Sequence, residues 1–516
     1  MSFFGHPRGL FLLFIVEMWE RFSYYGMRAL LVLYLISEMS PDAANPGRGW
    51  SEGNAYKLYG LYTGLAYLLP VVGGFIADRL LGTHRSMLLG GTIIALGHIV
   101  LAVSGLGALA QNDMGMSLFI VGLALIILGT GYFKPTVSVM VGQLYPPGDA
   151  RRDGGFSIFY MGINVGAFLS ALGCGLLGEK VGWHYGFGAA AVGMVAGMAV
   201  YIWGKPRVMP TVGAAPENKP NLVAPLFVGT LIVSALVGAF FHWGGFGALD
   251  RASVALMGVP FANWFVPLTV IALVLGGSYW FVMKQLADDR GPVTCILIFV
   301  LFNAFFWIAF EQAGSTLNVF ALNDTNRTFF GWEMPASWFQ SLNPFFIIVF
   351  APVFAWLWAW LGERGKNPSQ PVKIGLGLIL LGLGYVFMVF GAMGVATGQR
   401  VSPMWLFMAY FFHTMGELCL SPTGLSFVTK AAPARFVSFL MGIWFLSSFV
   451  ANYGGGLVAA TVEGIEAGET TLPWSGWFEE GTRAPFFMLF VVSSIGAGVV
   501  ILLFTPMLKK ALRGRG

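Results

Sequence analysis

A ten-residue stretch near the start of the chain, EMWERFSYYG, combines two acids, an arginine and two tyrosines. Glu17, Glu20 and Arg21 lie at positions i, i+3 and i+4. Tyr24 follows at i+7, with Tyr25 beside it, so a helix would stack these side chains on one face. Carboxylates next to a guanidinium can gain and release a proton as their partners change. The spacing therefore predicts a helix with an acid–base face.

The segments on both sides of this stretch, GLFLLFIV and MRALLVLYLI, are almost wholly apolar. Three more ionisable residues lie in apolar segments: Lys134 in LGTGYFKPTVSVM, Glu311 in FFWIAFEQAGSTLNVFA and Glu417 in FFHTMGELCLSPTG. A charge at the centre of a bilayer costs about 2.5 kcal/mol or more. Ion pairs that only hold helices together would not need so many such groups. We therefore expect them to line a water-filled path.

The signs of these charges differ between the two halves of the chain. Arg21 and Lys134 in the first half can hold a carboxylate, whereas Glu417 in the second half can hold an ammonium group. Aromatic walls for such a path are available at Tyr24, Tyr25, Tyr62, Trp307 and Trp444. Amides that can bond a peptide group are available at Asn164 and Asn343. This chemistry favours a proton-coupled carrier of a solute charged at both ends.

The composition places these residues in a membrane. Of the 516 residues, 57% are hydrophobic and 10% are charged, and the mean hydropathy is +0.74. Soluble domains carry roughly a quarter charged residues, and each membrane span needs about 20 mostly apolar ones. Fourteen segments qualify as spans: 11–37, 55–77, 86–109, 116–144, 155–178, 184–203, 222–242, 262–283, 292–321, 338–361, 373–396, 403–429, 436–460 and 485–508.

The distribution of basic residues predicts the orientation. With a cytoplasmic N-terminus and alternating sides, nineteen of the 29 lysines and arginines fall on the cytoplasmic side and seven on the other. This asymmetry predicts that both termini are cytoplasmic. It also accounts for the net charge of +5, so we expect no nucleic-acid partner. The first apolar segment has no small-residue cleavage site, and we expect no removable signal peptide.

The segment 204–222, rich in proline and polar residues, separates six spans from the rest and is predicted to be a cytoplasmic linker. Two spans follow it, and six more complete the chain. The predicted organisation is a six-helix bundle over 1–206, the linker with two extra transmembrane helices over 207–290, and a second six-helix bundle over 291–516.

Several motifs resemble those of one family. EMWERFSYYG resembles the E-x-x-E-R-F-x-Y-Y-G signature of the proton-dependent oligopeptide transporter family, and FSIFYMGINVGAF resembles its F-Y-x-x-I-N-x-G signature. FWIAFEQAGSTLN and GELCLSPTGLSFV are similar to its seventh and tenth helices. The loop GGFIADRLLGTHR resembles that of the wider major facilitator superfamily. The resemblance covers nearly the whole chain and is closest to prokaryotic members.

The resemblance implies an all-α polytopic membrane protein with the major facilitator fold: two six-helix bundles plus two extra helices, fourteen transmembrane helices in all. It implies uptake of di- and tripeptides, driven by the proton gradient, through alternating access in the bacterial plasma (inner) membrane. It implies a transporter rather than an enzyme, surrounded by membrane lipid, working as a monomer, with protons as coupling ion and no other cofactor.

The resemblance also implies residue roles. The proton-coupling residues are Glu17, Glu20, Arg21 and Glu311. The peptide-binding residues are Arg21, Tyr24, Tyr25, Tyr62, Lys134, Asn164, Trp307, Asn343, Glu417, Ser421 and Trp444. Arg21 and Lys134 would meet the peptide carboxylate, and Glu417 its amine. A gate is predicted between Arg48 and Asp324, although Glu333 is also nearby in the sequence.

One departure from the family concerns histidine. Animal relatives carry a histidine in the second helix, whereas YKLYGLYTGLAYLLP has none, so the proton must be handled by carboxylates here. His413 lies one turn before Glu417 and would either tune that glutamate or simply pack.

Three alternatives remain open from the sequence. The same fold could carry another small anionic or peptide-like solute, such as nitrate or a peptidomimetic drug, although nitrate would not need Glu417. An intramembrane enzyme is disfavoured because no nucleophile–base pair or H-E-x-x-H pattern occurs. A purely structural or receptor protein would not require opposed charges. No metal site is predicted, because the three cysteines (Cys174, Cys295 and Cys419) lie far apart and the six histidines show no ligand spacing.

Overall fold

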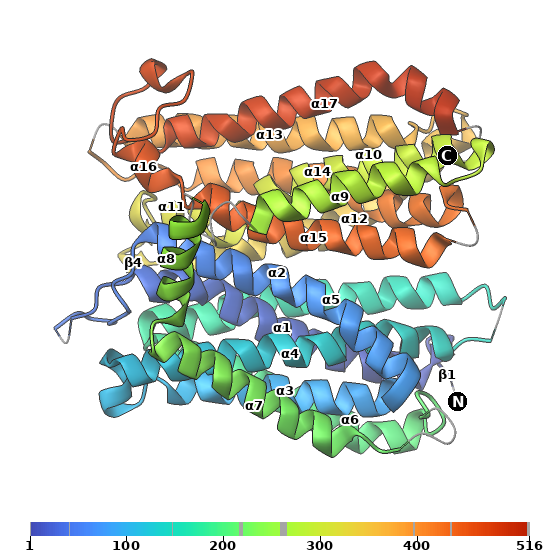
Figure 1. The fold of residues 1–516 in the computed structure, drawn as a ribbon, viewed down its shortest axis with the longest axis horizontal. Coiled ribbons are helices and arrows are strands. Elements are labelled where there is room, and N and C mark those ends of the chain that lie inside the picture. The colour runs from blue at the N-terminus through green and yellow to red at the C-terminus, as the bar shows by residue number, and fades with distance from the viewer. Residues whose placement is uncertain are drawn as a thin grey trace. The chain divides into compact units, whose positions relative to one another are not determined.

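The computed structural model describes residues 2–40, 42–146, 148–215, 220–257, 266–395, 398–433 and 436–512. Most of the described chain is helical (Figure 1). The α-helices are α1 Arg8–Ile36, α2 Glu52–Ile76, α3 Thr83–Val103, α4 Asp113–Gln143, α5 Arg152–Lys180, α6 Trp183–Val208, α7 Val223–His242, α8 Gly245–Met257, α9 Val266–Met283, α10 Ala287–Phe310, α11 Thr316–Asn323, α12 Leu342–Glu363, α13 Gln370–Val395, α14 Met404–Ala431, α15 Val437–Ala459, α16 Val462–Glu466 and α17 Ala484–Leu512. The strands are β1 Ser2–Phe3, β2 His6–Pro7, β3 Thr328–Phe329 and β4 Trp332–Glu333.

The long helices match the predicted spans to within a few residues at most ends. Among the described residues, eleven helical segments are long and apolar enough to cross a membrane. Helix α1 has a span's length too, with 29 residues, but it also carries the charged stretch. Helices α9 and α14 occupy two further predicted spans, 262–283 and 403–429. The chain is therefore an all-α polytopic membrane protein.

The structure corrects the predicted span 292–321, which is not one continuous α-helix. Helix α10 ends at Phe310, a 3-10 turn covers Glu311–Gly314, and α11 begins at Thr316. The side chain of Gln312 stabilises the break, because its Nε2 donates to the Gly455 carbonyl at 3.0 Å and its Oε1 accepts from the Thr316 hydroxyl at 2.9 Å. Helix α8 and the two hairpins were likewise not predicted.

The described helices form two compact units. The first unit contains residues 1–51, 65–247 and 335–344, and the second contains 52–64, 248–334 and 345–516. Helix α2 is thus divided between the units after Gly64. The predicted boundaries at 206 and 290 stay a prediction.

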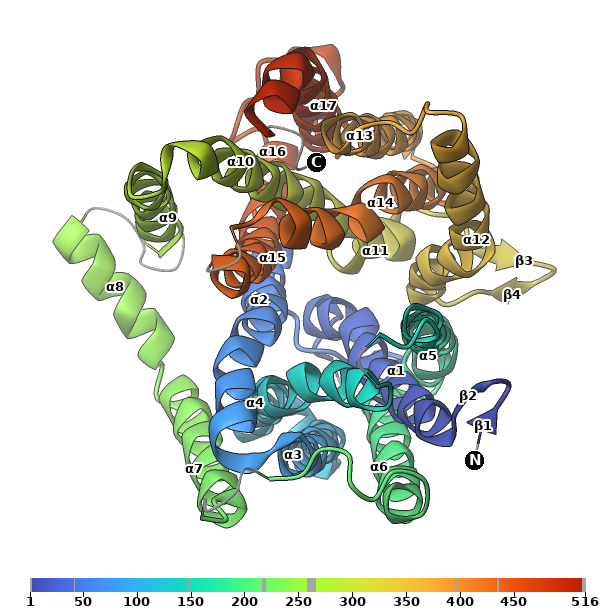
Figure 2. The ribbon, with the colours of Figure 1, turned by 90° about the vertical axis from the view of Figure 1, so that its right-hand side faces the viewer.

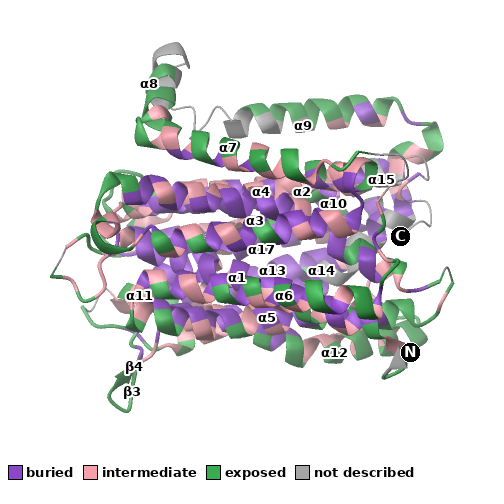
Figure 3. Ribbon diagram, turned by 90° about the horizontal axis from the view of Figure 1, so that it is seen from below, coloured by how far each residue is buried: buried purple, intermediate pink, exposed green. Residues whose placement is uncertain are grey.

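In the first unit, α1 packs against α5 and α6, α3 packs against α4, and the extra helix α7 lies along α4 (Figure 2). Close packing of α1 on α5 needs a glycine, because a Cβ at Gly166 would lie 2.2 Å from the Met18 carbonyl oxygen. Buried residues run along α1 and α4, whereas much of α7 is exposed (Figure 3).

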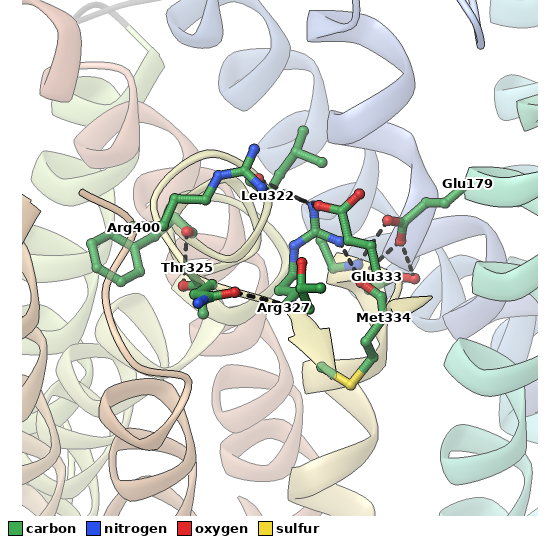
Figure 4. Close-up of polar contacts among 12 residues, drawn as sticks. Glu179, Leu322, Thr325, Arg327, Glu333, Met334 and Arg400 are labelled. Atoms are coloured by element: carbon green, nitrogen blue, oxygen red, sulfur yellow. Dashed lines mark hydrogen bonds and ion pairs between the residues drawn. The ribbon is translucent and has the colours of Figure 1, made fainter. Parts of the chain in front are cut away.

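The short segment 335–344 is held in the first unit by one carboxylate of α5. Glu179 accepts the backbone N–H groups of Ala336 and Ser337 at 2.7 and 2.8 Å, and the Ser337 hydroxyl at 2.6 Å (Figure 4). An acid at the start of a helical turn satisfies N–H groups that have no partner within the turn. In the second unit, α13 packs against α14 and α17, and α10 packs against α15.

Candidate functional site

Helix α1 brings the predicted acid–base residues together inside the first unit. Arg21 Nη2 donates to Glu20 Oε1 at 2.7 Å, and Arg21 Nε also contacts the other oxygen of Glu20. The same Nε lies 3.2 Å from Glu17 Oε1, one helical turn away. All three residues are at most 6% exposed. One buried guanidinium is therefore shared by two carboxylates, and the ionised trio carries one net negative charge that a single proton would remove.

Two tyrosines complete this face of α1. The Arg21 guanidinium lies 5.3 Å from the centre of the Tyr24 ring. The Tyr24 and Tyr25 rings meet edge to face, with 5.3 Å between their centres. The 3.6-residue period of the helix produces this stack, as the spacing predicted.

Lys134 of α4 lies next to an aromatic ring that sequence reasoning missed. Its Nζ is 3.6 Å from the centre of the Tyr67 ring, a cation–π distance. Tyr67 stands in the predicted second span, but no charge close to it in the sequence pointed to it. Asn164 of α5 is 6% exposed, and its Nδ2 donates to the Tyr160 carbonyl of its own helix at 3.1 Å.

In the second unit, a chain of hydrogen bonds joins the two predicted tryptophans. Trp307 Nε1 donates to Asn303 Oδ1 at 3.2 Å, and Asn303 Nδ2 donates to Ser447 Oγ at 3.1 Å. The Ser447 hydroxyl in turn donates to the Trp444 carbonyl at 2.6 Å. Asn303 and Ser447 were not predicted, because each lies in an apolar span without a charged neighbour.

The two predicted site glutamates of the second unit are buried as well. Glu311, in the break after α10, is 5% exposed, and Glu417 of α14 is 7% exposed. His413 packs against aromatic rings, with its ring centre 4.7 Å from that of Tyr385 and 6.4 Å from that of Phe310. This environment favours the packing interpretation of the histidine.

Three predicted binding residues remain to be placed: Tyr62, Asn343 and Ser421. Tyr62 is 1% exposed and belongs to the part of α2 in the second unit. Asn343, at the start of α12, belongs to segment 335–344 of the first unit. The Ser421 side chain lies outside the described residues.

Each member of the predicted gate has neighbours in its own unit. Arg48 is 6% exposed and donates to the Tyr34 hydroxyl at 2.6 Å, the Asn112 carbonyl at 3.0 Å and the Leu109 carbonyl at 3.2 Å. Asp324 Oδ2 lies 3.8 Å from Arg483 Nε. The pairing of Arg48 with Asp324 stays a prediction.

Arg483 is the centre of an ion cluster that sequence reasoning missed. Its Nη2 lies 2.7 Å from Glu52 Oε1 and its Nε lies 2.8 Å from Glu466 Oε1, in addition to the contact with Asp324. The Tyr56 hydroxyl donates to Glu52 at 2.8 Å. Burial raises the pKa of Asp324, and the attraction of Arg483 offsets only part of this. Four segments that are distant in the sequence meet here.

Metal-binding clusters are not found among the described residues: no group of three or more histidine, cysteine, aspartate or glutamate side chains could hold an ion. The three cysteines are buried and unpaired with one another.

Known proteins are similar to this chain in sequence and in fold. The model of the POT family matches residues 84–475, a range that does not include the acid–base stretch of α1. The di-/tripeptide transporter of Lactococcus lactis subsp. cremoris is 38% identical over 98% of this chain and 97% of its own length. The crystal structure of peptide transporter POT in complex with sulfate has a TM-score of 0.80 at 36% identity and covers 100% of this chain and 97% of that one.

A second solved structure, a POT family transporter in complex with 5-aminolevulinic acid, has a TM-score of 0.78 at 30% identity, with 98% of each chain covered. The family match, the full-length relatives and the shared fold all agree. This chain is therefore a membrane transporter with the major facilitator fold, and it belongs to the POT family.

Proposed function

We propose that this protein is a proton-coupled symporter that imports di- and tripeptides by alternating access. The observation that carries the proposal is the buried guanidinium of Arg21, shared by Glu17 and Glu20 within a transmembrane helix. Charged side chains inside a membrane cost free energy, and they normally occur where they have a function. The ligand that these two carboxylates can take up and release is a proton. The di-/tripeptide transporter that is similar to the whole chain supports the choice of cargo.

In the proposed coupling step, protonation of one carboxylate of α1 frees the guanidinium to change partners. Arg21 then binds either Glu311 or the carboxylate of a peptide. Glu17 and Glu20 both contact Arg21 Nε, and Glu20 also accepts from Nη2, so loss of one carboxylate contact leaves the other as a tether.

The proposed peptide orientation follows from the signs of the charges. Arg21 and Lys134 bind the C-terminal carboxylate, and Glu417 binds the amino group. The Lys134 ammonium lies on the Tyr67 ring, and its positive charge attracts a peptide carboxylate. Asn164 and Asn343 bond the peptide backbone. The pocket walls are Tyr24, Tyr25, Tyr62, Trp307, Ser421 and Trp444.

The proposed setting is a bacterial inner membrane, with both termini in the cytoplasm and the monomer as the working unit. Arg48 and Asp324 form the proposed outer gate. Protons are the coupling ion, and no resident cofactor takes part. A peptide-like solute is the second candidate cargo, because one of the similar structures was solved in complex with 5-aminolevulinic acid.

Counterflow in proteoliposomes tests the cargo. Vesicles loaded with unlabelled dialanine should accumulate labelled dialanine from outside, whereas vesicles loaded with nitrate should not. Accumulation driven only by nitrate, or only by 5-aminolevulinic acid, would overturn the peptide assignment.

The coupling is tested with a matched pair of variants. Glu20→Gln should lose peptide uptake driven by an inward proton gradient, because the remaining Glu17–Arg21 pair is already neutral and no longer needs a proton to remove a net charge. Glu38→Gln, an exposed position just beyond α1, should keep it. Equal uptake in both variants would remove Glu20 from the coupling mechanism.

A further inference from the structure

The tripeptide Phe-Phe-Gly occurs twice in the sequence, at 3–5 and 329–331, and both copies make the same structure. In each copy, the second phenylalanine and the glycine form the two-residue turn of a short hairpin. In the first hairpin Phe3 pairs with His6, and in the second Phe329 pairs with Trp332. We call the two elements the N-terminal hairpin (residues 2–7) and the central hairpin (residues 328–333).

The turn phenylalanine has an unusual backbone in both hairpins. Phe4 has φ 47° and Phe330 has φ 51°, and each precedes a glycine that also has a positive φ. Among the described residues, these two are the only non-glycine residues with a positive φ. Two-residue hairpin turns with two positive φ angles favour Asn-Gly, and a bulky residue at the first position is strained. Both hairpins therefore carry a phenylalanine at a turn position whose backbone conformation disfavours it.

The side chains of these two residues with a strained backbone are also exposed. The relative exposure is 82% for Phe4 and 109% for Phe330. The Phe329 and Trp332 side chains of the central hairpin are each 44% exposed. Strain is normally retained where the unusual conformation has a use, and here its effect is to present an apolar ring at the tip of a hairpin.

The base of the central hairpin is fixed by ionic contacts on one side (Figure 4). Arg327 and Arg400 both bind Glu333, at 3.0 and 3.1 Å. Arg327 also donates to the Met334 carbonyl. Because successive side chains of a strand point to opposite faces, Trp332 and its partner lie on the face away from Glu333. The N-terminal hairpin is held similarly: Arg151 donates to the Gly5 carbonyl at 2.8 Å, and His6 shares a hydrogen bond of 2.8 Å with Tyr145.

The position of the central hairpin indicates what covers it. It follows α11 and precedes α12, so it lies where membrane-spanning segments end. Seen along the helices, it projects sideways past α12 (Figure 2), and seen from below it lies at the helix ends (Figure 3). Helix α12 exposes Phe345, Val349 and Trp356, the kind of face that lipid covers. The aromatic tip therefore continues a lipid-facing surface at the depth of the headgroups.

The N-terminal hairpin directly precedes α1, at the start of the first span. Nine predicted spans separate it from the central hairpin, and this odd number predicts that the two hairpins lie on opposite sides of the membrane. Aromatic side chains favour the membrane–water interface on both sides. We propose that the two Phe-Phe-Gly hairpins are membrane-interface anchors, each of which places its turn phenylalanine among the lipid headgroups of one leaflet.

A fluorescent probe at the hairpin tips tests the location. Cys174, Cys295 and Cys419 are replaced by alanine, and Phe330→Cys or Phe4→Cys is labelled with an environment-sensitive nitrobenzoxadiazole group in proteoliposomes. Both probes should emit at shorter wavelengths than a control at Glu479→Cys, an exposed position in the loop before α17. They should be quenched more by lipids with a shallow spin label than by a deep one or by aqueous iodide.

Iodide quenching at 330 as strong as at 479 would overturn the proposal. Shielding from iodide without quenching by spin-labelled lipid would also overturn it, and crosslinking of two copies through position 330 would then identify a second copy as the occupant.

A second test uses the opposite demands of backbone and bilayer. Phe330→Asn creates the favoured Asn-Gly turn, so backbone preference alone predicts a higher unfolding midpoint. An interface anchor predicts a lower midpoint in liposomes for Phe330→Asn and an unchanged one for Phe330→Trp. A Phe330→Asn midpoint equal to or above that of the unmodified protein would contradict the anchor.

Discussion

At the scale of single residues, the arrangement around Arg21 limits what the site can do. The guanidinium contacts both Glu17 and Glu20, and all three are buried. Removing one partner of a buried ion pair leaves the other charge unpaired, which is costly. In the proposed mechanism, every state of the transport cycle must therefore supply Arg21 with a carboxylate, from α1, from the peptide or from Glu311.

The role of Glu311 follows from that requirement. Glu311→Gln should abolish peptide accumulation driven by a proton gradient, because glutamine cannot exchange a proton. It should leave some peptide-for-peptide exchange, because an amide still fits the break after α10. Both rates are measured with labelled dialanine in proteoliposomes.

Glu363→Gln is the matched control for this experiment, since Glu363 is an exposed glutamate at the end of α12. It should behave like the unmodified protein. A Glu311→Gln variant that still concentrates peptide against its gradient would show that the proton is carried elsewhere.

The proposed binding of the peptide's amino and carboxyl termini gives a second prediction. Truncating one partner of a buried charge pair costs roughly 2–5 kcal/mol, a loss of about 30-fold or more in affinity. The unmodified protein should therefore discriminate strongly against N-acetylated dialanine, and Glu417→Gln should discriminate much less. The measurement is competition of capped and uncapped dialanine against a labelled peptide.

Dialanine amide provides the reciprocal arm. Lys134→Gln should lose discrimination against the amide, whereas Glu417→Gln should retain it. The same discrimination in all three proteins would show that other residues bind the peptide ends.

At the scale of elements, the Arg483 cluster ties together the starts of α2 and α17, the end of α11 and the short helix α16. Arg483→Gln should lower the free energy of unfolding by about 3–5 kcal/mol, because it removes a buried counter-charge from three partly buried carboxylates. Thermal and chemical denaturation in detergent measure this change.

Arg400→Gln is the control for an arginine of similar chemistry in an exposed ion pair. The Arg400 side chain is 51% exposed, and its pair with Glu333 should be worth about 0–1 kcal/mol. A loss no larger for Arg483→Gln than for Arg400→Gln would show that the cluster does not hold these elements together.

The same cluster predicts a pH dependence through Asp324. Burial, the largest cause, raises its pKa above the ordinary value of 3.8, although Arg483 pulls it back in part and Glu52 adds to the rise. A carboxyl with a raised pKa in the folded state contributes stability that is fully present below pH 3.8 and is lost as the pH rises through the raised value. Asp324→Asn should therefore gain stability relative to the unmodified protein as the pH rises.

Asp149 supplies a control of opposite sign. Hydrogen bonds from Arg151 lower its pKa to about 2, so its contribution is lost only as the pH falls toward that value. Denaturation midpoints from about pH 4 upward should then shift with pH for Asp324→Asn and stay nearly parallel to the unmodified protein for Asp149→Asn. A constant difference for Asp324→Asn across this range would contradict the assignment.

At the scale of the whole molecule, the proposed alternating access would require the two halves of the chain to open and close against each other, and the proposed gate tests this. Arg48→Asp and Asp324→Arg should each reduce transport. The double swap should restore part of it, because the opposite charges are present again. Restoration should be incomplete, since aspartate cannot replace the hydrogen bonds of Arg48 to Tyr34 and to the 109–112 segment.

Uptake of labelled dialanine in the four proteins decides the question. Losses that simply add in the double variant would mean that Arg48 acts within the first unit alone. Tyr34→Phe is a useful companion, because it removes one hydrogen bond of Arg48 and leaves the charge in place.

The sequence by itself determined the membrane class, the positions of most spans and the acid–base face of α1. Inside a bilayer, the N–H and C=O groups of a long apolar segment can form hydrogen bonds only with one another, so such segments form helices. The helical period then fixes which neighbours in the sequence share a face, as it does for Glu17, Glu20 and Arg21. Both inferences need only local information.

Only the tertiary structure decided the contacts between distant residues. Glu52, Asp324, Glu466 and Arg483 come from four separate segments, and nothing local to any one of them indicates the other three. The bond between Asn303 and Ser447 and the break after Phe310 likewise depend on neighbours that folding brings in. The hairpins escaped prediction because strands of two residues are too short for an alternating pattern to be recognised. Local periodicity specifies helices, whereas a contact between segments exists only once those helices have packed.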